Sequence, residues 1–330
     1  MRSRILGLVV VLVLGLGAMS LPVAAGVFTA EGSFDRTLKV TGPVDLDIET
    51  GSGSITVRPG EGGSVHVIGT IKARSDLGLN TREAEEKVRQ LEANPPIVQT
   101  GNTIRLGYIE DRELRRNVSI SYEVTVPRET KLRSRTGSGS QTVDGIQGPV
   151  YAETGSGSLT ITSIGSEVEA ETGSGGIELR AIQGRVKADT GSGSIRGVQV
   201  AGPVVASTGS GSVDLEVTAP GDIAVDTGSG GVEVRGVHGG LVVETGSGSV
   251  SVDGEPVRGW NLSTGSGNIT VQLPNQAAFD LDARTSSGGI YTDHPITVQG
   301  SIGKRELHGK VRGGGALLAL STGSGNIRIE

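Results

Sequence analysis

Apolar and polar residues alternate with a period of two in short segments that recur along most of the chain. Five and seven positions after the threonine of most Thr-Gly-Ser-Gly tetrapeptides stand apolar residues, as at Leu159 and Ile161. A second alternating segment runs into the tetrapeptide, as at Val150, Ala152 and Thr154. Such alternation is typical of a strand with one buried face. The pattern predicts two short strands per repeat, with the corner threonine facing inward.

The tetrapeptide recurs about every 18 residues and sets the length of one repeat. Its copies begin at Thr50, Thr136, Thr154, Thr172, Thr190, Thr208, Thr227, Thr245, Thr264 and Thr322, with a degenerate Thr-Ser-Ser-Gly at Thr285. A repeat this short excludes helical-pair repeats and propeller blades. Two strands and two corners per repeat, stacked in register, predict an all-β fold: a parallel β-solenoid with about 18 residues per coil.

The glycines of the tetrapeptide are candidate structural corners. They are Gly137, Gly139, Gly155, Gly157, Gly173, Gly175, Gly191, Gly193, Gly209 and Gly211. A chain that reverses within a few residues needs positive φ, which glycine adopts without a steric penalty from Cβ. We therefore expect left-handed backbone at these corners.

Between Thr50 and Thr136 the repeat is interrupted, which predicts a small N-terminal α+β region over residues 26–135, followed by the solenoid over 136–330. The apolar spacing of Ala84, Val88 and Leu91 predicts a helix at about 81–93, which could cover the end of the solenoid or lie at its side. Strand-like runs at 97–108 and 118–126, with charged residues 110–116 between them, predict a hairpin. At the other end, the last coil shows no cap.

Residues 1–25 have the pattern of a secretory signal peptide. Arg2 and Arg4 precede an apolar stretch, and the small residues Val23 and Ala25 suit the positions that signal peptidase recognises. Cleavage after Ala25 is the first choice and after Ser20 the second, and a membrane anchor is the alternative. After cleavage no run of membrane-spanning length follows. The absence of cysteine excludes disulfides and a lipidated cysteine.

Composition fits a thin, repeated core. The 330 residues include 55 glycines and only 2% aromatics, and stacked coils leave little room for large rings. The net charge of −6, with no basic face visible by spacing, argues against nucleic-acid binding. The basic cluster Arg112, Arg115 and Arg116 is interpreted as a solvated hairpin tip.

An acidic column precedes the corners and is the sharpest candidate for chemistry. Its members are Glu153, Glu171, Asp189, Asp226 and Glu244. Stacked carboxylates could bind calcium between coils, but calcium-binding repeats place Asp inside a Gly-Gly-x-Gly-x-Asp turn, which is missing here. Solvated acids balanced by Lys187, Arg180 and Arg235 are the favoured interpretation.

Two other activities have weaker support. Outward threonines at Thr142 and Thr160 resemble the start of an ice-binding array, but charged residues follow them in the same column. A polysaccharide-processing enzyme would need paired carboxylates and aromatic platforms; Trp260, Tyr151 and Tyr291 offer little platform material. His66, His238, His294 and His308 are scattered, so no catalytic residue, cofactor or metal-binding set is assigned.

Several of these features together resemble a known family. The strand Ser121-Tyr122-Glu123-Val124-Thr125-Val126-Pro127 leads into Thr136, and the repeated tetrapeptide continues to Asn326-Ile327. With the signal peptide, this is similar to the bacterial putative-adhesin family of β-strand-repeat proteins, a domain of unknown function, over nearly the whole mature chain. The resemblance implies an exported right-handed β-helix and supplies no catalytic residues.

The sequence as a whole favours a non-enzymatic structural or adhesin-like protein of the cell envelope, in the periplasm or at the cell surface. Its partner is expected to be a cell-envelope polymer or protein that meets the outer faces of the solenoid. The alternative is a polysaccharide-processing enzyme of β-helix type.

Overall fold

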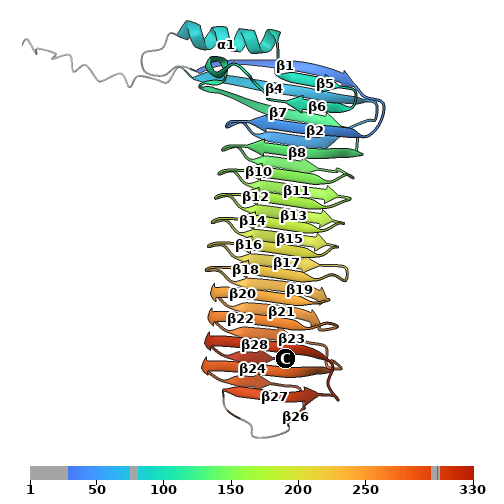
Figure 1. The fold of residues 1–330 in the computed structure, drawn as a ribbon, viewed down its shortest axis with the longest axis vertical. Coiled ribbons are helices and arrows are strands. Elements are labelled where there is room, and N and C mark those ends of the chain that lie inside the picture. Colours follow the sequence, from blue (N-terminus) through green and yellow to red (C-terminus); the bar gives the residue numbers. More distant parts are fainter. Residues whose placement is uncertain (1–28, 75–80, 299–302, 304) are drawn as a thin grey trace, which may run out of the picture.

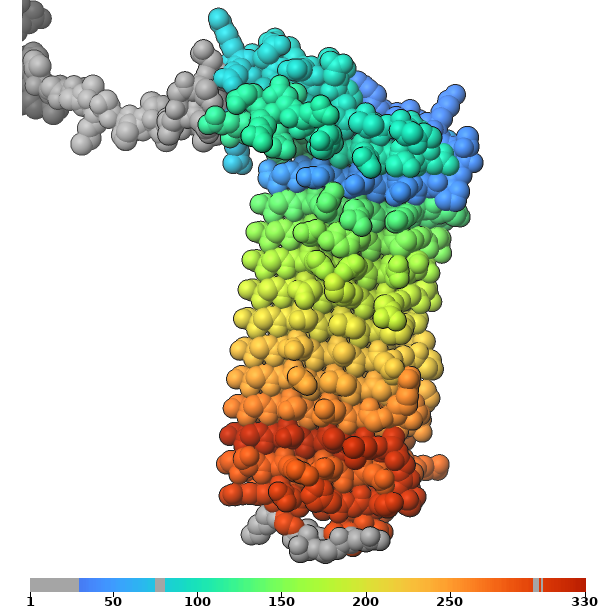
Figure 2. Space-filling model, viewed as in Figure 1, coloured from blue at the N-terminus to red at the C-terminus, as the bar shows by residue number. Residues whose placement is uncertain are grey.

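The chain forms a long rod of two stacked β-sheets in a computed structural model that describes residues 29–74, 81–298, 303 and 305–330 (Figure 1). The predicted signal peptide at residues 1–25 lies outside the described residues. Successive coils form layers of similar width along the rod in Figure 2.

The first sheet has fourteen strands. In spatial order from the N-terminal end they are β1 (Thr29–Lys39), β4 (Ser64–Arg74), β7 (Val118–Val126), β3 (Ile55–Pro59), β9 (Gln141–Asp144), β11 (Leu159–Ile164), β13 (Ile177–Ile182), β15 (Ile195–Val200), β17 (Val213–Val217), β19 (Val232–His238), β21 (Val250–Glu255), β23 (Ile269–Gln272), β29 (Ile327–Ile329) and β25 (Ile290–Thr292).

The second sheet has fifteen strands. From the same end they are β5 (Ile97–Thr100), β6 (Thr103–Leu106), β2 (Val44–Thr50), β8 (Thr130–Thr136), β10 (Val150–Thr154), β12 (Val168–Thr172), β14 (Val186–Thr190), β16 (Val204–Thr208), β18 (Ile223–Thr227), β20 (Leu241–Ser247), β22 (Trp260–Ser266), β28 (Ala316–Ser324), β24 (Phe279–Ser287), β27 (Glu306–Val311) and β26 (Ile296–Thr297).

Each regular coil contributes one strand to each sheet, and equivalent residues of neighbouring coils pair in parallel. Val150 pairs with Val168 in the second sheet, and Leu159 pairs with Ile177 in the first. These side chains are buried between the sheets, while the residues that alternate with them point outward. The predicted all-β parallel solenoid with two strands per coil is therefore confirmed.

A buried threonine closes every tetrapeptide corner. The hydroxyl of Thr154 donates to the carbonyl of Gly139 in the preceding coil, at 2.9 Å, and accepts from the backbone N–H of Gly157 in its own coil, at 3.1 Å. The donated bond to a corner glycine repeats at Thr136, Thr172, Thr190, Thr208, Thr227, Thr245, Thr264, Thr285 and Thr322. The inward orientation inferred from the sequence is thus correct, and the hydroxyl links consecutive coils.

The physical reason predicted for the corner glycines was wrong. None of the ten candidate corner glycines has φ in the left-handed region. Glycine is required because the coils stack so closely: a Cβ at Gly157 would lie 1.9 Å from the carbonyl oxygen of Gly139. Left-handed backbone occurs instead within the first sheet, at Ser163, Ala181 and Gln199, with φ of 57°, 53° and 57°.

The N-terminal end is covered by antiparallel strands and a helix. β1 pairs antiparallel with β4, and β4 with β7. Helix α1 (Thr81–Ala93) lies across this end in Figure 1 and packs on β1 and β4 through Ala84, Val88 and Leu91. The second helix, α2 (Arg112–Arg115), is a single turn. Neither helix, nor any other in the described part of the chain, has the length and apolarity needed to cross a bilayer.

The predicted hairpin between runs 97–108 and 118–126 was also wrong. The first run is itself a hairpin of β5 and β6 in the second sheet, whereas β7 lies in the first sheet. Residues 107–117 between them form a corner of a coil that stacks outside the coil of β2 and β3. Both sheets continue across residues 135 and 136, since β2 pairs with β8 from Val44 to Thr50. The domain division there stays a prediction.

At the C-terminal end, chain order and spatial order differ. The last coil, β28 and β29, lies between the coil of β22 and β23 and the coil of β24 and β25. The outermost positions of the second sheet are taken by β27, antiparallel to β24, and by β26. The expectation of an uncapped last coil was therefore wrong, because the last coil in sequence is an inner one in space.

Candidate functional site

The acidic column predicted from the sequence lies on the outer face of the second sheet. It consists of Glu153, Glu171, Asp189, Asp226 and Glu244. Glu153 pairs in register with Glu171, and Glu171 with Asp189, before Ser207 interrupts the series. Consecutive carboxylates thus sit on neighbouring strands, about 4.8 Å apart in the sheet.

Lys187 balances the first part of this column. Its ammonium lies 2.5 Å from Glu169 and 2.9 Å from Glu171. The hydrogen bond to Glu169 is the largest cause that raises the pKa of Lys187, and the same bond lowers the pKa of Glu169. Arg180 and Arg235, expected to help, lie on β13 and β19 of the other sheet, where they pair with acids of that face.

The interpretation of the column as solvated acids, with calcium binding as the less favoured alternative, stays a prediction. Within residues 29–74, 81–298, 303 and 305–330, no three acidic or histidine side chains are grouped closely enough to hold a metal ion.

The aromatic and histidine residues singled out from the sequence are dispersed. Trp260 is a core residue whose indole N–H donates to the Gly239 carbonyl, at 2.9 Å. Tyr291 is exposed on the terminal strand β25. The histidines His66, His238 and His308 each lie beside a different carboxylate, at Asp35, Glu255 and Asp282.

Tyr151 does lie among charged groups, on the outer face of the second sheet. The Arg133 guanidinium stacks 4.9 Å from its ring centre, and its hydroxyl donates to Glu153 at 2.8 Å. Burial and the Glu153 carboxylate raise the pKa of Tyr151 to about 12. Tyr151 and Arg133 border a shallow groove of about 310 Å³ that is also lined by Lys187.

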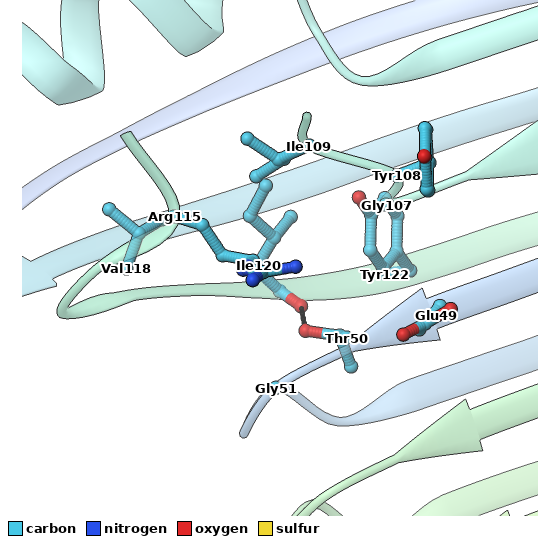
Figure 3. A pocket seen from close by; sticks show the side chains of 10 residues that line it. All are labelled: Glu49, Thr50, Gly51, Gly107, Tyr108, Ile109, Arg115, Val118, Ile120 and Tyr122. Carbon is cyan, nitrogen blue, oxygen red and sulfur yellow. Dashed lines mark hydrogen bonds between the residues drawn. The ribbon is translucent and has the colours of Figure 1, made fainter. Parts of the chain in front are cut away.

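A hollow lies outside this face at the N-terminal end, and we call it the N-terminal hollow. Its volume is about 390 Å³ (Figure 3). It is lined by Glu49, Thr50, Gly51, Gly107, Tyr108, Ile109, Arg115, Val118, Ile120 and Tyr122.

An unusual corner creates the N-terminal hollow. A regular coil turns between its two strands with a few residues, as from Thr154 to Leu159, whereas 107–117 separate β6 from β7. The first tetrapeptide corner, at Thr50, lies under this longer segment, and its hydroxyl donates to the Ile120 carbonyl at 2.7 Å. The long segment arches away from Gly51 and leaves space where other coils have a stacked glycine corner.

A buried hydroxyl faces this space. Tyr122 is 1% exposed, its ring packs edge-on against Phe34, and no group in the described part of the chain hydrogen-bonds its hydroxyl. Burial raises the pKa of Tyr122, so the phenol stays protonated. Gly107, with φ of 89°, passes close to the Glu49 backbone beside this hydroxyl: a Cβ there would lie 1.7 Å from the Glu49 carbonyl oxygen and 3.3 Å from the phenol oxygen.

Charged groups complete the lining. Arg115 belongs to α2, which Asp111 caps by accepting hydrogen bonds from two backbone N–H groups of the turn. It makes no ion pair with any residue that the structure describes. Glu49 lies on the opposite side in Figure 3. Arg115 is exposed, in agreement with the predicted solvation, but it lies in the corner between β6 and β7, which is not a hairpin tip, and its side chain borders the hollow.

A second depression, of about 500 Å³, adjoins the hollow and shares Glu49 and Tyr108 with it. Within it the Arg135 guanidinium lies 3.5 Å from both Asp47 and Glu49. Tyr108 is 63% exposed between the two spaces. Sequence reasoning missed Tyr108, Tyr122 and Glu49; the only signal was the interruption of the repeat after Thr50.

Comparisons with known proteins give two similar solved structures. A "putative cell adhesion protein" of Clostridium sporogenes is 10% identical, with a TM-score of 0.19 over 91% of this chain and 99% of that chain. A "putative adhesin" of Bacteroides fragilis is 13% identical, with a TM-score of 0.36 over 91% and 97%. These similarities are too low to support an argument about function. No curated protein matches the chain.

A family model described as Toastrack DUF4097 matches residues 44–330. The match begins at β2, the first strand of the first tetrapeptide coil, and runs through both sheets to the last residue. The resemblance to a β-strand-repeat family of unknown function is thereby confirmed: the chain belongs to the Toastrack DUF4097 family.

Proposed function

We propose that this protein is an exported, non-enzymatic, adhesin-like β-solenoid of the cell envelope, and that it binds an envelope polymer or protein through its outer faces. Residues 1–25 would direct export to the periplasm or the cell surface. The bound partner would meet the solenoid formed by both sheets.

The observation that carries this proposal is the register of outward side chains. On the second sheet, Arg133, Tyr151, Glu169 and Lys187 follow one another on four successive strands. On the first sheet, Glu178, Arg196, Asp214 and Glu233 do the same. Side chains repeated about every 4.8 Å offer many weak contacts to an extended ligand. Together these contacts can hold the ligand tightly.

The carboxylates near the hollows support a binding role over catalysis. A glycoside hydrolase needs one carboxyl group that holds a proton and a second that acts as base or nucleophile. Asp47 and Glu49 instead both lie 3.5 Å from the Arg135 guanidinium, an arrangement typical of structural ion-pair networks.

Binding of residues 26–330 to a washed, insoluble envelope fraction tests the proposal. We expect saturable co-sedimentation that weakens as salt is raised, with no release of soluble saccharide from the fraction. Absence of co-sedimentation, or release of saccharide fragments over time, would contradict the proposal.

Two matched variants identify the face that binds. One changes Arg133, Arg185 and Lys187 of the second sheet to Ser, and the other changes Arg180, Arg196 and Arg235 of the first sheet to Ser. Both remove three positive charges from the outside of the rod. Loss of binding in one variant alone assigns the contact to that sheet; unchanged binding in both would count against attachment through cationic outer faces.

A further inference from the structure

We infer that the N-terminal hollow binds a uronate unit of an acidic polysaccharide, with Arg115 on the carboxylate and Tyr122 on a ring oxygen or hydroxyl. The inference rests on the proposed function, because it names the class of envelope polymer and one place where it is held. It adds a defined pocket to the repeated contacts of the outer faces.

The hydroxyl of Tyr122 is the first reason to expect a ligand. A buried phenol without a hydrogen-bond partner lowers the stability of the protein, and native proteins rarely leave such groups unpaired. Figure 3 shows this hydroxyl on the side of the ring that faces Ile109 and Gly107, inside the hollow. A ligand oxygen placed there would supply the missing partner.

Arg115 points to a carboxylate on that ligand. Its guanidinium borders the hollow and has no ion-pair partner among the described residues. Guanidinium groups bind carboxylates through two parallel hydrogen bonds. A phosphate monoester carries more negative charge, and Glu49 on the opposite wall disfavours it through repulsion. A carboxylate carries a single negative charge, so it can pair with Arg115 while being repelled less by Glu49.

The remaining lining fits a saccharide ring. Glu49 can accept hydrogen bonds from hydroxyl groups, and Val118 and Ile120 offer an apolar surface for the C–H face of a pyranose. The exposed ring of Tyr108 stands where the hollow meets the adjacent depression, so the next sugar of a chain could stack on it. The volume of about 390 Å³ suits one sugar unit and part of its neighbour.

A peptide ending in a free carboxylate is the competing class of ligand. Such termini are usually held by a series of backbone N–H groups. The polar groups of the hollow are instead the side chains of Arg115, Glu49 and Tyr122. This composition favours the hydroxyl-rich saccharide, and the peptide becomes one outcome of the test.

Titration calorimetry on residues 26–330 tests the inference with three probes: a tetramer of galacturonic acid, the same tetramer with its carboxyl groups reduced to alcohols, and the peptide Ala-Ala-Ala. We expect the acidic tetramer to bind, and the reduced tetramer and the peptide to bind at least about tenfold more weakly. Equal binding of the reduced tetramer, or tighter binding of the peptide, would overturn the inference.

Three variants locate the contact. Arg115→Gln and Tyr122→Phe should each weaken binding of the acidic tetramer about tenfold or more, because each removes a hydrogen-bonding group from the hollow. Arg112→Gln removes the same charge from a residue of the same helical turn that does not line the hollow, and it should leave affinity within about twofold. Without ligand, Tyr122→Phe should unfold at a temperature equal to or above that of the unchanged protein, which shows that the variant is folded.

The outcome separates this inference from the proposed function. Co-sedimentation with the envelope fraction without binding of the uronate tetramer overturns the inference alone. Binding of the tetramer that is unchanged by Arg115→Gln and Tyr122→Phe also overturns it, since the site then lies elsewhere. Absence of both forms of binding overturns both proposals.

Discussion

At Thr190 one buried hydroxyl joins two coils of the rod. It donates to the Gly175 carbonyl of the preceding coil at 2.8 Å and accepts from the N–H of Gly193 in its own corner at 3.1 Å. The same pair of bonds recurs at other corners, so each coil is tied to the one before it beyond the strand pairing.

Thr190→Val keeps the shape of the side chain and removes both bonds. Because a buried carbonyl and a partly buried N–H then lack a partner, we expect a loss of about 2 kcal/mol in the free energy of unfolding. Thr190→Ser is the matched control: it keeps the hydroxyl, loses one methyl group, and should cost about 1 kcal/mol or less. Urea unfolding measures both. A valine variant as stable as the serine variant would show that the hydroxyl contributes nothing.

Single residues were predicted well where the period alone decides their environment. Alternation placed Val150, Ala152 and Thr154 in the interior, and all three are buried. The corner glycines were correctly seen as special but explained wrongly, because φ was inferred from one turn in isolation. Gly157 is constrained by the carbonyl of Gly139 in the neighbouring coil, a contact that exists only once the coils stack.

At the level of the strand, outward side chains of neighbouring coils form short ladders of charge. Glu169 on β12 and Lys187 on β14 pair in register, and Lys187 also reaches Glu171. Glu171 lies next to Asp189 on the following strand. Without the lysine, three carboxylates would occupy neighbouring positions with no cation between them.

The stability of the rod should therefore depend on pH through this ladder. Because the folded pKa of Glu169 is lowered, its contribution is fully present above the unfolded pKa of about 4.3 and is lost as pH falls through the folded value. Lys187→Gln removes this contribution and leaves carboxylates that repel one another. Protonation of these carboxylates at low pH relieves the repulsion. The melting temperature of the variant should fall furthest below that of the unchanged protein near pH 7, with the gap closing towards pH 3.5.

Lys131→Gln is the control for this series. Lys131 also lies on the outer face of the second sheet and forms no ion pair with any described residue. Its melting temperature should follow that of the unchanged protein across the pH range. A constant gap between the Lys187→Gln variant and the unchanged protein, independent of pH, would contradict the assignment.

The partners in these ladders were only partly predictable from sequence. Lys187 was correctly placed near the acidic column, but Arg180 and Arg235 face the other side of the rod. Residues that are close in sequence can lie on opposite faces of the rod, because each coil contributes one strand to each sheet. The N-terminal hollow was missed for a related reason: Glu49 and Arg115 are far apart in sequence and line the same hollow only because the coil of β6 and β7 stacks on that of β2 and β3.

On the scale of the whole molecule, antiparallel strands close both sheets at the N-terminal end and the second sheet at the C-terminal end, where the first sheet ends on the parallel strand β25. β4 lies antiparallel to β7 at one end, and β27 lies antiparallel to β24 at the other. Such strands cover edges that would otherwise pair with other molecules. The parallel interior between them is a regular stack, and both closures depend on chain segments that interrupt the repeat.

Two deletions test the order of coils at the C-terminal end. Removing residues 316–330 takes out β28 and β29, so four strands on either side lose a partner; we expect loss of cooperative unfolding and self-association, seen by gel filtration with light scattering. Removing residues 275–314 shortens the distance from Thr264 to Thr322 from 58 residues to 18, the length of one repeat. This larger deletion should still give a cooperatively unfolding solenoid.

The two deletions can be told apart because the larger one is expected to reduce the cooperativity of unfolding less. Far-ultraviolet circular dichroism and urea unfolding would report whether the remaining coils are intact. Equal loss of cooperativity in both variants would show that β24, β25 and β27 are needed for more than covering the end.

The order of coils could not be derived from the sequence. Thr285 and Thr322 both mark corners, and their spacing of 37 residues, close to two repeats, was compatible with coils that simply follow one another. In the structure Thr322 pairs with both Thr264 and Thr285. A repeat pattern defines which residues form coils, whereas the lengths of the irregular connections decide which coils are neighbours.

The position of β28 and β29 between strands that precede them in sequence also affects the order in which the rod can fold. Residues 316–330 leave the ribosome after residues 279–312, yet they occupy the place between those residues and the coil of β22 and β23. The coils before them can stack one by one as the chain emerges, but this part of the rod can close only after its final segment has arrived. Until then β22 and β24 each present an open edge, and this is the stage at which a nascent chain is most exposed to mispairing.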